Sequence, residues 1–273
     1  MIDWKKIIAE TPAPDPTLSI DQFLDQAFAQ VNAPSVGQYG KLKELLGPCF
    51  IGPDEIKQAL QVGDLGAIPA LPKGLIEALE SNSLITPEQK VFQDHTLMLM
   101  PASFDGVANT VLNFKDLVEL AEQRRKLVKP GIGPIFCSDN SWYFKGKAKE
   151  EKWAQAPLEQ ASWVLTPNIV PGDTRKTNYA NQDLLIGSKY QAYQRGSAQE
   201  LIQFLGLAEL ITGERRYPSS WGWTSTPTDA AGACPGQFVS VGGFSAAGFR
   251  VALVHPARSD SALGAFLGRK FLA

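Results

Sequence analysis

The chain has 273 residues, enough for one large or two modest domains, and its 44% hydrophobic and 20% charged residues are typical of a folded globular protein. The net charge is −2, which excludes the strongly basic character of most nucleic-acid-binding domains. Only residues 141–273 are mildly basic. Nucleic acid is therefore not an expected partner, and weak single-stranded binding by the second half is a minor alternative.

The sequence favours a soluble cytoplasmic protein. Its first residues lack the apolar core and small-residue cleavage site of a secretory signal. Apolar runs such as 97–100 are far shorter than the ~20 residues that cross a bilayer, so no membrane partner is expected. Cys49, Cys137 and Cys234 are odd in number and far apart, which argues against disulfides and for a reducing compartment.

The first half of the sequence predicts short helices joined at proline and glycine. Ser19 and Gln22 form a capping box ahead of apolar residues at helical spacing, which predicts a helix over 19–31. Continuous apolar runs at 96–100 and 132–137 predict buried strands. Further helices are predicted over 2–10, over 38–46, from Pro53 onward, over 73–80 and over 114–127.

The second half predicts one well-defined helix followed by strands. Ser197 and Glu200 form a capping box, apolar residues then repeat at helical spacing, and Gly213 occupies the position after the helix. A further helix is expected at 178–186, and a closing helix around 263–267. Alternating or β-branched runs predict strands over 162–166, 221–226, 238–244 and 249–254, the last two joined as a hairpin.

Together these elements predict an α+β fold, in which a helix-rich N-terminal part is followed by helices packed on a short, mainly antiparallel sheet. The charge run at 145–152 suggests a boundary between a part spanning 1–144 and a C-terminal domain spanning 153–273. The run also fits a solvated turn within one composite domain, so both organisations stay open.

The residues that point to binding lie just after the well-defined helix. On a strand, Trp221 and Trp223 point to the same face. If exposed, that face is a stacking platform for a sugar ring, a base or a partner protein; if buried, it is core. Arg215 and Arg216 beside Tyr217 are suited to clamp a carboxylate or phosphate. Alternatively, the arginines bond the last carbonyls of their own helix and pair with nearby acids.

Fewer residues point to catalysis. Cys234 and His255 form a thiol nucleophile and its base if the predicted hairpin brings them together. Asp173 and Glu214, together with Arg215, offer a second set. Either set would make the protein a hydrolase or transferase of unrecognised type.

The two histidines limit acid–base and metal chemistry. Asp94 and His95 are neighbours at a predicted strand start, where side chains alternate between faces, so a surface histidine is expected. A structural zinc site needs about four Cys or His ligands at close spacing. The five such residues of this chain are dispersed. We therefore expect no metal and no cofactor.

Several short motifs in the second half form a recognisable succession. They are Trp163–Pro167 (WVLTP), Pro171–Arg175 (PGDTR), Gly213–Arg215 (GER), Val241–Phe244 (VGGF) and the terminal Arg269–Phe271 (RKF). This succession resembles a pattern in a family of uncharacterised bacterial proteins, and 95–101 is similar to an upstream part of the same pattern. The resemblance covers about residues 90–273. It implies a bacterial source and no particular activity.

The sequence thus favours a non-enzymatic binding or scaffold protein. Its C-terminal domain would present Trp221, Trp223, Arg215 and Arg216 to a partner, which is another protein or a small anionic or sugar ligand. The hydrolase or transferase is the alternative.

Overall fold

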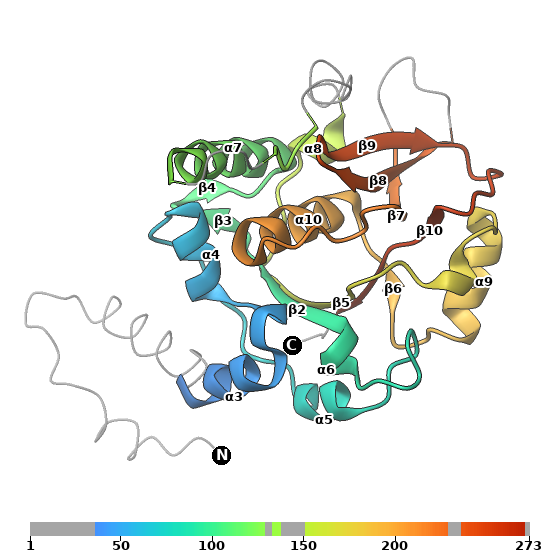
Figure 1. Cartoon of the computed structure of the whole chain (residues 1–273), viewed down its shortest axis with the longest axis horizontal. Coiled ribbons are helices and arrows are strands. Elements are labelled where there is room, and N and C mark those ends of the chain that lie inside the picture. Colours follow the sequence, from blue (N-terminus) through green and yellow to red (C-terminus); the bar gives the residue numbers. More distant parts are fainter. Residues whose placement is uncertain (1–35, 129–132, 138–150, 229–235, 271–273) are drawn as a thin grey trace, which may run out of the picture.

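The computed structural model describes residues 36–128, 133–137, 151–228 and 236–270. The helices expected over 2–10 and 19–31 lie outside these residues, as does most of the charge run at 145–152. The described chain combines helices with several mixed sheets, so the α+β class is confirmed (Figure 1). The expectation of one short sheet is wrong, because strands from the first half and from the C-terminus build a second one.

Among the described residues, the helices are short except for α7 and α10. The α-helices are α3 (Val36–Leu46), α4 (Pro53–Leu60), α5 (Leu75–Glu80), α6 (Val91–Asp94), α7 (Val111–Val128), α8 (Lys152–Gln155), α9 (Tyr179–Ser188) and α10 (Ala198–Thr212). Two 3-10 turns, η1 (Gly47–Cys49) and η3 (Gly172–Thr174), join other elements. No helix among the described residues combines the length and apolar character needed to cross a bilayer.

The first large sheet has five strands in the order β1-β2-β5-β11-β6. Its strands are β1 (Phe50–Ile51), β2 (His95–Met100), β5 (Ser162–Pro167), β11 (Leu267–Lys270) and β6 (Gln194–Arg195). β1 runs parallel to β2, whereas the other neighbours are antiparallel. Because β2 pairs with β5, strands from both sides of the 145–152 run lie side by side. The pairing joins strands from before and after the charge run, and both domain organisations stay predictions.

The second large sheet has four strands in the order β10-β7-β8-β9, which are β10 (Leu263–Ala265), β7 (Trp221–Pro227), β8 (Phe238–Ser245) and β9 (Gly248–Val254). The predicted β8–β9 hairpin is confirmed. β10 pairs with β7 in parallel. A small hairpin of β3 (Ser103–Phe104) and β4 (Val107–Ala108) lies apart from both sheets.

The helix expected around 263–267 is absent, because this stretch forms β10 and the start of β11. Ala265, Phe266 and Leu267 are all fully buried, so their periodicity carries no helical signal. Pairing of β10 with β7 and of β11 with β6, together with the bonds of Phe266 to Trp223 and Gly196, gives their backbone groups partners. The run expected as a strand at 132–137 is likewise not regular; its described part makes a single bridge, Phe136 to Phe249.

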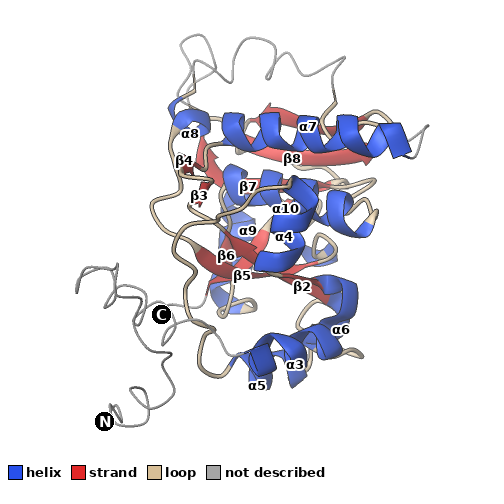
Figure 2. Cartoon of the chain, turned by 90° about the vertical axis from the view of Figure 1, so that its left-hand side faces the viewer, coloured by secondary structure: helices blue, strands red, loops and turns tan. Residues whose placement is uncertain are grey.

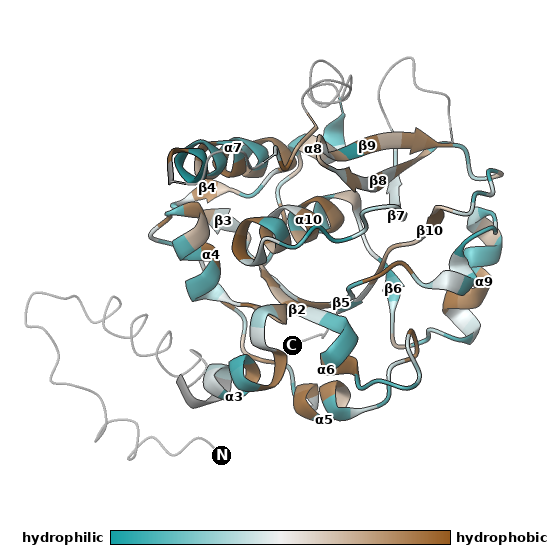
Figure 3. Cartoon of the chain, in the orientation of Figure 1, coloured by the Kyte–Doolittle hydropathy of each residue, from teal (hydrophilic) through white to brown (hydrophobic). Residues whose placement is uncertain are grey.

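Helix α10 lies between the two large sheets and contacts β1, β2, β7 and β8 as well as α4 and α7 (Figures 1 and 2). Every residue from Ala198 to Glu209 is buried. Much of the helix is correspondingly hydrophobic (Figure 3). A helix that is apolar on all sides belongs in a core. One cluster of buried side chains, reaching from Leu42 to Phe266 along the chain, surrounds it.

The ends of α10 follow the sequence prediction. Ser197 Oγ accepts from the Glu200 backbone N–H at 3.2 Å, and the Glu200 carboxylate accepts from the Ser197 backbone N–H at 2.6 Å. Gly213 adopts a left-handed conformation with φ 76° and closes the helix. The capping box and the terminal glycine therefore fix where this helix begins and ends.

We predict that Ser197→Ala lowers the free energy of unfolding by about 1 kcal/mol, because the N-cap acceptor for the Glu200 N–H is lost. Urea denaturation followed by circular dichroism measures the change. The matched control is Ser219→Ala, at an exposed turn serine, which we expect to stay within about 0.5 kcal/mol of the parent protein. Equal effects of the two substitutions would contradict the prediction.

Candidate functional site

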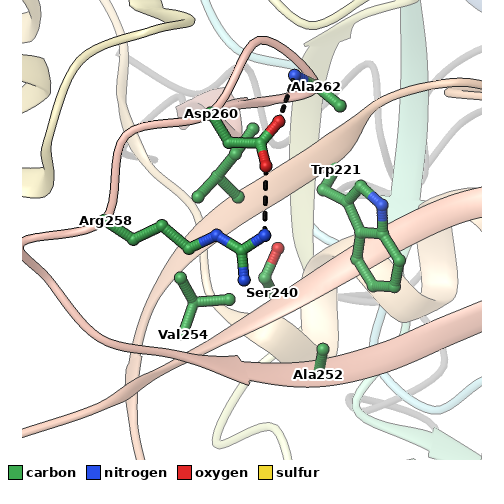
Figure 4. A pocket seen from close by; sticks show the side chains of 8 residues that line it. Trp221, Ser240, Ala252, Val254, Arg258, Asp260 and Ala262 are labelled. Atoms are coloured by element: carbon green, nitrogen blue, oxygen red, sulfur yellow. Dashed lines mark hydrogen bonds and ion pairs between the residues drawn. The ribbon is translucent and has the colours of Figure 1, made fainter.

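The outer face of the β7–β8–β9 sheet is the candidate site. A Cβ added to Gly222 would lie 2.6 Å from Leu201 of α10, so position 222 faces the helix. Its neighbours Trp221 and Trp223 therefore point to the opposite face. There a pocket of about 190 Å³ opens between the sheet and the loop that follows β9 (Figure 4). Its lining residues are Trp221, Ser240, Ala252, Val254, Arg258, Asp260, Ala262 and Leu263.

The indole of Trp221 forms one wall of this pocket and is half-buried (Figure 4). Its ring packs against the backbone at Gly243, where an added Cβ would lie 3.0 Å from the ring. Gly243 also has φ 59°, a left-handed conformation that favours glycine. The glycines of β8 thus let one part of the indole lie against the strand, while the rest of the indole faces the pocket.

Arg258 and Asp260 form the polar wall. Arg258 Nη2 lies 3.0 Å from Asp260 Oδ2, and the other carboxylate oxygen accepts from the Ala262 backbone N–H at 2.9 Å. The Ala262 N–H and then the Arg258 guanidinium hold the pKa of Asp260 below its usual value, so the carboxylate is ionised at neutral pH. Figure 4 shows the Arg258 side chain reaching across the pocket, with Trp221 on the other side.

The rest of the lining is apolar apart from Ser240. Ser240 Oγ donates to the Gly222 carbonyl at 3.1 Å, which fixes its orientation on the floor. Val254 and Leu263 belong to a small cluster of buried side chains with Trp223. The site therefore combines an aromatic wall, an apolar floor and one oriented pair of opposite charges, the composition of a small-molecule pocket.

Trp223 and Tyr217 are not presented to a partner, which corrects the sequence expectation. Trp223 is 0% exposed, because Tyr179 packs edge-on against it with ring centroids 5.1 Å apart and Phe238 joins the same cluster. Tyr217 is also buried, has φ 57°, and donates its hydroxyl to the Pro167 carbonyl at 3.1 Å. Only Trp221 of the two tryptophans faces a pocket.

The two arginines do not form a joint clamp. Arg215 donates to the Ser245 carbonyl, lies over the Phe244 ring and faces the buried carboxylate of Glu209 at 3.7 Å. Arg216 instead pairs with Glu214 at 2.6 Å. The alternative reading, in which the arginines bond the protein's own groups, therefore describes these two side chains better than a ligand clamp does.

The proposed catalytic residues have separate surroundings. Cys234 lies outside the described residues, and the exposed His255 accepts from the Ala257 backbone N–H through Nδ1 at 3.2 Å. Asp173 bonds to Lys189 at 2.7 Å and to the Tyr190 hydroxyl at 2.6 Å. Both catalytic sets stay predictions.

The expectation of a surface histidine at position 95 is wrong. His95 is 0% exposed; its Nδ1 bonds to the Asp94 carboxylate, and its Nε2 lies 2.8 Å from the Tyr193 hydroxyl. The strand argument failed because Asp94 ends α6 rather than belonging to β2, so its side chain is not forced to the opposite face. Asp94 Oδ2 also accepts from Ser83 Oγ at 2.5 Å.

This buried network affects the titration of Asp94. Burial alone would raise the pKa of its carboxyl group, but the hydrogen bonds from His95 and Ser83 outweigh burial and leave the pKa below its ordinary value. A carboxyl whose pKa is lower in the folded than in the unfolded state stabilises the fold above its unfolded pKa. That stabilisation is lost as the pH falls through the folded pKa.

No family model, curated protein or solved structure matches this chain. The resemblance to uncharacterised bacterial proteins therefore stays a prediction, and the geometry alone supports the site. Within the described ranges, no group of three or more His, Cys, Asp and Glu side chains could hold a metal ion.

We predict that Asp94→Asn lowers the free energy of unfolding by about 2 kcal/mol at neutral pH, because a charged acceptor of two buried donors is lost. The difference from the parent protein shrinks as the pH falls below about 4, the ordinary pKa of an aspartate, because the unfolded parent then binds a proton that the folded carboxylate binds only at lower pH. Urea denaturation across the acid range measures it. Asp116→Asn, at an exposed aspartate, is the control and should change little. A pH-independent difference would refute the assignment.

Proposed function

We propose that this protein binds a small, electrically neutral, ring-shaped ligand of the sugar class in the Trp221 pocket. The observation that carries the proposal is the half-buried indole of Trp221 facing the Arg258–Asp260 pair across the pocket (Figure 4). The proposal narrows the sequence-based expectation of an aromatic and arginine surface to one pocket. It also replaces Arg215 and Arg216 by Arg258 as the polar partner.

The aromatic wall supports a ring-shaped ligand. An indole offers a large, rigid apolar face, and stacking of a ring on such a face contributes substantially to affinity. One face of a pyranose ring is made of C–H groups and suits this wall, while its hydroxyls point to the side. The pocket volume of about 190 Å³ fits one such ring better than a drug-sized ligand, for which about 300 to 1,000 Å³ is usual.

The charged pair supports a neutral ligand over an anion. Arg258 is already paired with Asp260, so an incoming anion would have to displace a carboxylate that the Ala262 N–H also holds. A ligand with neighbouring hydroxyls can instead accept from the free guanidinium N–H groups and donate to the carboxylate, leaving the pair intact. Donor and acceptor side by side match the hydroxyl group, which is both.

Binding is favoured over catalysis by the nature of the lining. Its titratable members are the exposed Arg258 and the ionised Asp260, which stabilise one another. None of the described lining residues is a histidine or a cysteine. A bacterial, cytoplasmic setting, expected from the sequence, remains part of this proposal.

The test is calorimetric titration of the full chain with single sugars (glucose, galactose, mannose and N-acetylglucosamine) and with inorganic phosphate and acetate as anionic probes. We expect at least one sugar to bind and both anions to fail. Trp221→Ala should weaken sugar binding by about tenfold or more, because stacking is lost. Trp221→Phe should retain part of the affinity, whereas Arg258→Gln and Asp260→Asn should each weaken it.

Arg250→Gln is the matched control, because Arg250 is an exposed arginine of β9 that is not part of the pocket lining. Sugar binding should be unchanged in this variant. Binding of anions alone would overturn the ligand class. Sugar binding that Trp221→Ala leaves unchanged would overturn the site, and failure of every probe to bind would overturn the proposal as a whole.

A further inference from the structure

Cys49 lies where β1 and β2 of the five-stranded sheet begin and β5 ends. It is not among the residues that line the Trp221 pocket. It ends η1 directly before β1, which runs parallel to β2. β5 runs antiparallel to β2, with His95 opposite Pro167, so the end of β5 lies beside the start of β2. The thiol is free and half-buried.

Two side-chain N–H donors point at the sulfur. Asn168 Nδ2 lies 3.7 Å from Cys49 Sγ, and Arg216 Nη2 lies 3.6 Å from it. The orientation of the Asn168 amide is fixed, because its oxygen accepts from Thr96 Oγ1 at 2.6 Å and the amide nitrogen must then face the sulfur. Arg216 in turn is held by Glu214 at 2.6 Å. The donors are therefore oriented before any ligand arrives.

Two further donors here have no acceptor among the residues that the structure describes. Thr166 is 1% exposed, and its hydroxyl has no hydrogen-bond partner among the described residues. It stands directly opposite Thr96, so these two side chains share one face of the sheet, and Thr96 in turn bonds to Asn168. Arg216 Nε is buried and also lacks a partner within the described part of the chain. Buried donors without acceptors are costly, so they point to a missing acceptor at this place.

We propose that Cys49 is a redox-modification site, at which a hydroperoxide oxidises the thiol to a sulfenic acid and Thr166 and Arg216 hold the added oxygen. The sulfur attacks the outer oxygen of the hydroperoxide, an S–O bond forms, and the O–O bond breaks. The sulfur loses two electrons and the hydroperoxide gains them. The thiol proton goes to the departing oxygen, so that water or an alcohol leaves.

The site has the features that such a reaction requires. The thiol is half-buried, so a small hydroperoxide can reach it. The new oxygen is an acceptor for the two donors that lack one among the described residues, whereas a thiol sulfur is only a weak acceptor. Oxidation therefore completes the hydrogen bonding of a network that the reduced protein leaves incomplete.

The test follows Cys49 in the reduced full chain exposed to hydrogen peroxide or tert-butyl hydroperoxide, with dimedone trapping of sulfenic acid and mass spectrometry of peptides. The reference is a synthetic peptide of residues 46–52, which has the same local sequence without the fold. We expect Cys49 of the protein to be labelled at least about tenfold faster than the peptide. The reason is that a hydrogen bond from the charged Arg216 stabilises the reacting sulfur enough to change the rate by about that factor.

Two variants separate the roles of the donors. Arg216→Gln should slow the labelling of Cys49 by about tenfold, since the charged donor is lost. Thr166→Val removes only a hydroxyl that has no partner within the described ranges, so the reduced protein should be as stable as the parent. Its sulfenic acid should, however, pass to sulfinic acid about fivefold faster, since one hydrogen bond to the oxygen is missing. Arg250→Gln is the control and should behave as the parent.

Labelling of Cys49 no faster than that of the peptide would overturn the proposal, and this comparison needs no variant to fold. Unchanged rates in Arg216→Gln and Thr166→Val, with both variants folded by circular dichroism, would overturn the assigned roles of the two donors. The experiment is independent of sugar binding, because it involves neither Trp221 nor Arg258.

Discussion

The burial of α10 between two sheets is the constraint on which the rest of the structure depends. A helix surrounded by protein must find apolar neighbours on every side and acceptors for its polar groups. Two of its polar side chains meet this demand at one place: Gln199 donates to the Asn109 carbonyl at 2.7 Å, and Gln203 exchanges hydrogen bonds with the Asn109 side chain. Asn109 lies just before α7. These bonds therefore tie α10 to the segment that leads into the second long helix.

Both proposed sites follow from how α10 packs and where it ends. Leu201 on α10 occupies the space beside Gly222, so the flanking Trp221 is turned to the outer face of its strand, where the pocket lies. Gly213 ends the helix in a left-handed turn, after which the chain brings Arg216 to the edge of the other sheet beside Cys49. One helix therefore positions an aromatic wall on one sheet and a guanidinium on the other.

The sequence predicted features that depend on neighbours in the chain and missed those that depend on distant partners. The capping box of Ser197 and the hairpin of β8 and β9 are local and were confirmed. The strands around Phe266 depend on partners far away in sequence, and full burial hides their period. In the same way, Arg258 and Asp260 could not be linked to Trp221 without knowing that β10 pairs with β7. The partnership of His95 required knowing that Asp94 ends a helix.

Tyr217 is the residue that fixes the two sites relative to each other. Its ring packs beside Gly222 of β7, where an added Cβ would lie 3.5 Å from it, and its hydroxyl donates to Pro167 at the end of β5. Burial raises the pKa of its phenol well above the ordinary value, so the hydroxyl remains protonated and keeps donating across the physiological range. Its left-handed backbone conformation is unfavourable for a tyrosine. The contacts with Gly222 and Pro167 hold the residue in this conformation. Since Arg216 is the preceding residue, the guanidinium beside Cys49 is held by the same anchor that joins the two sheets.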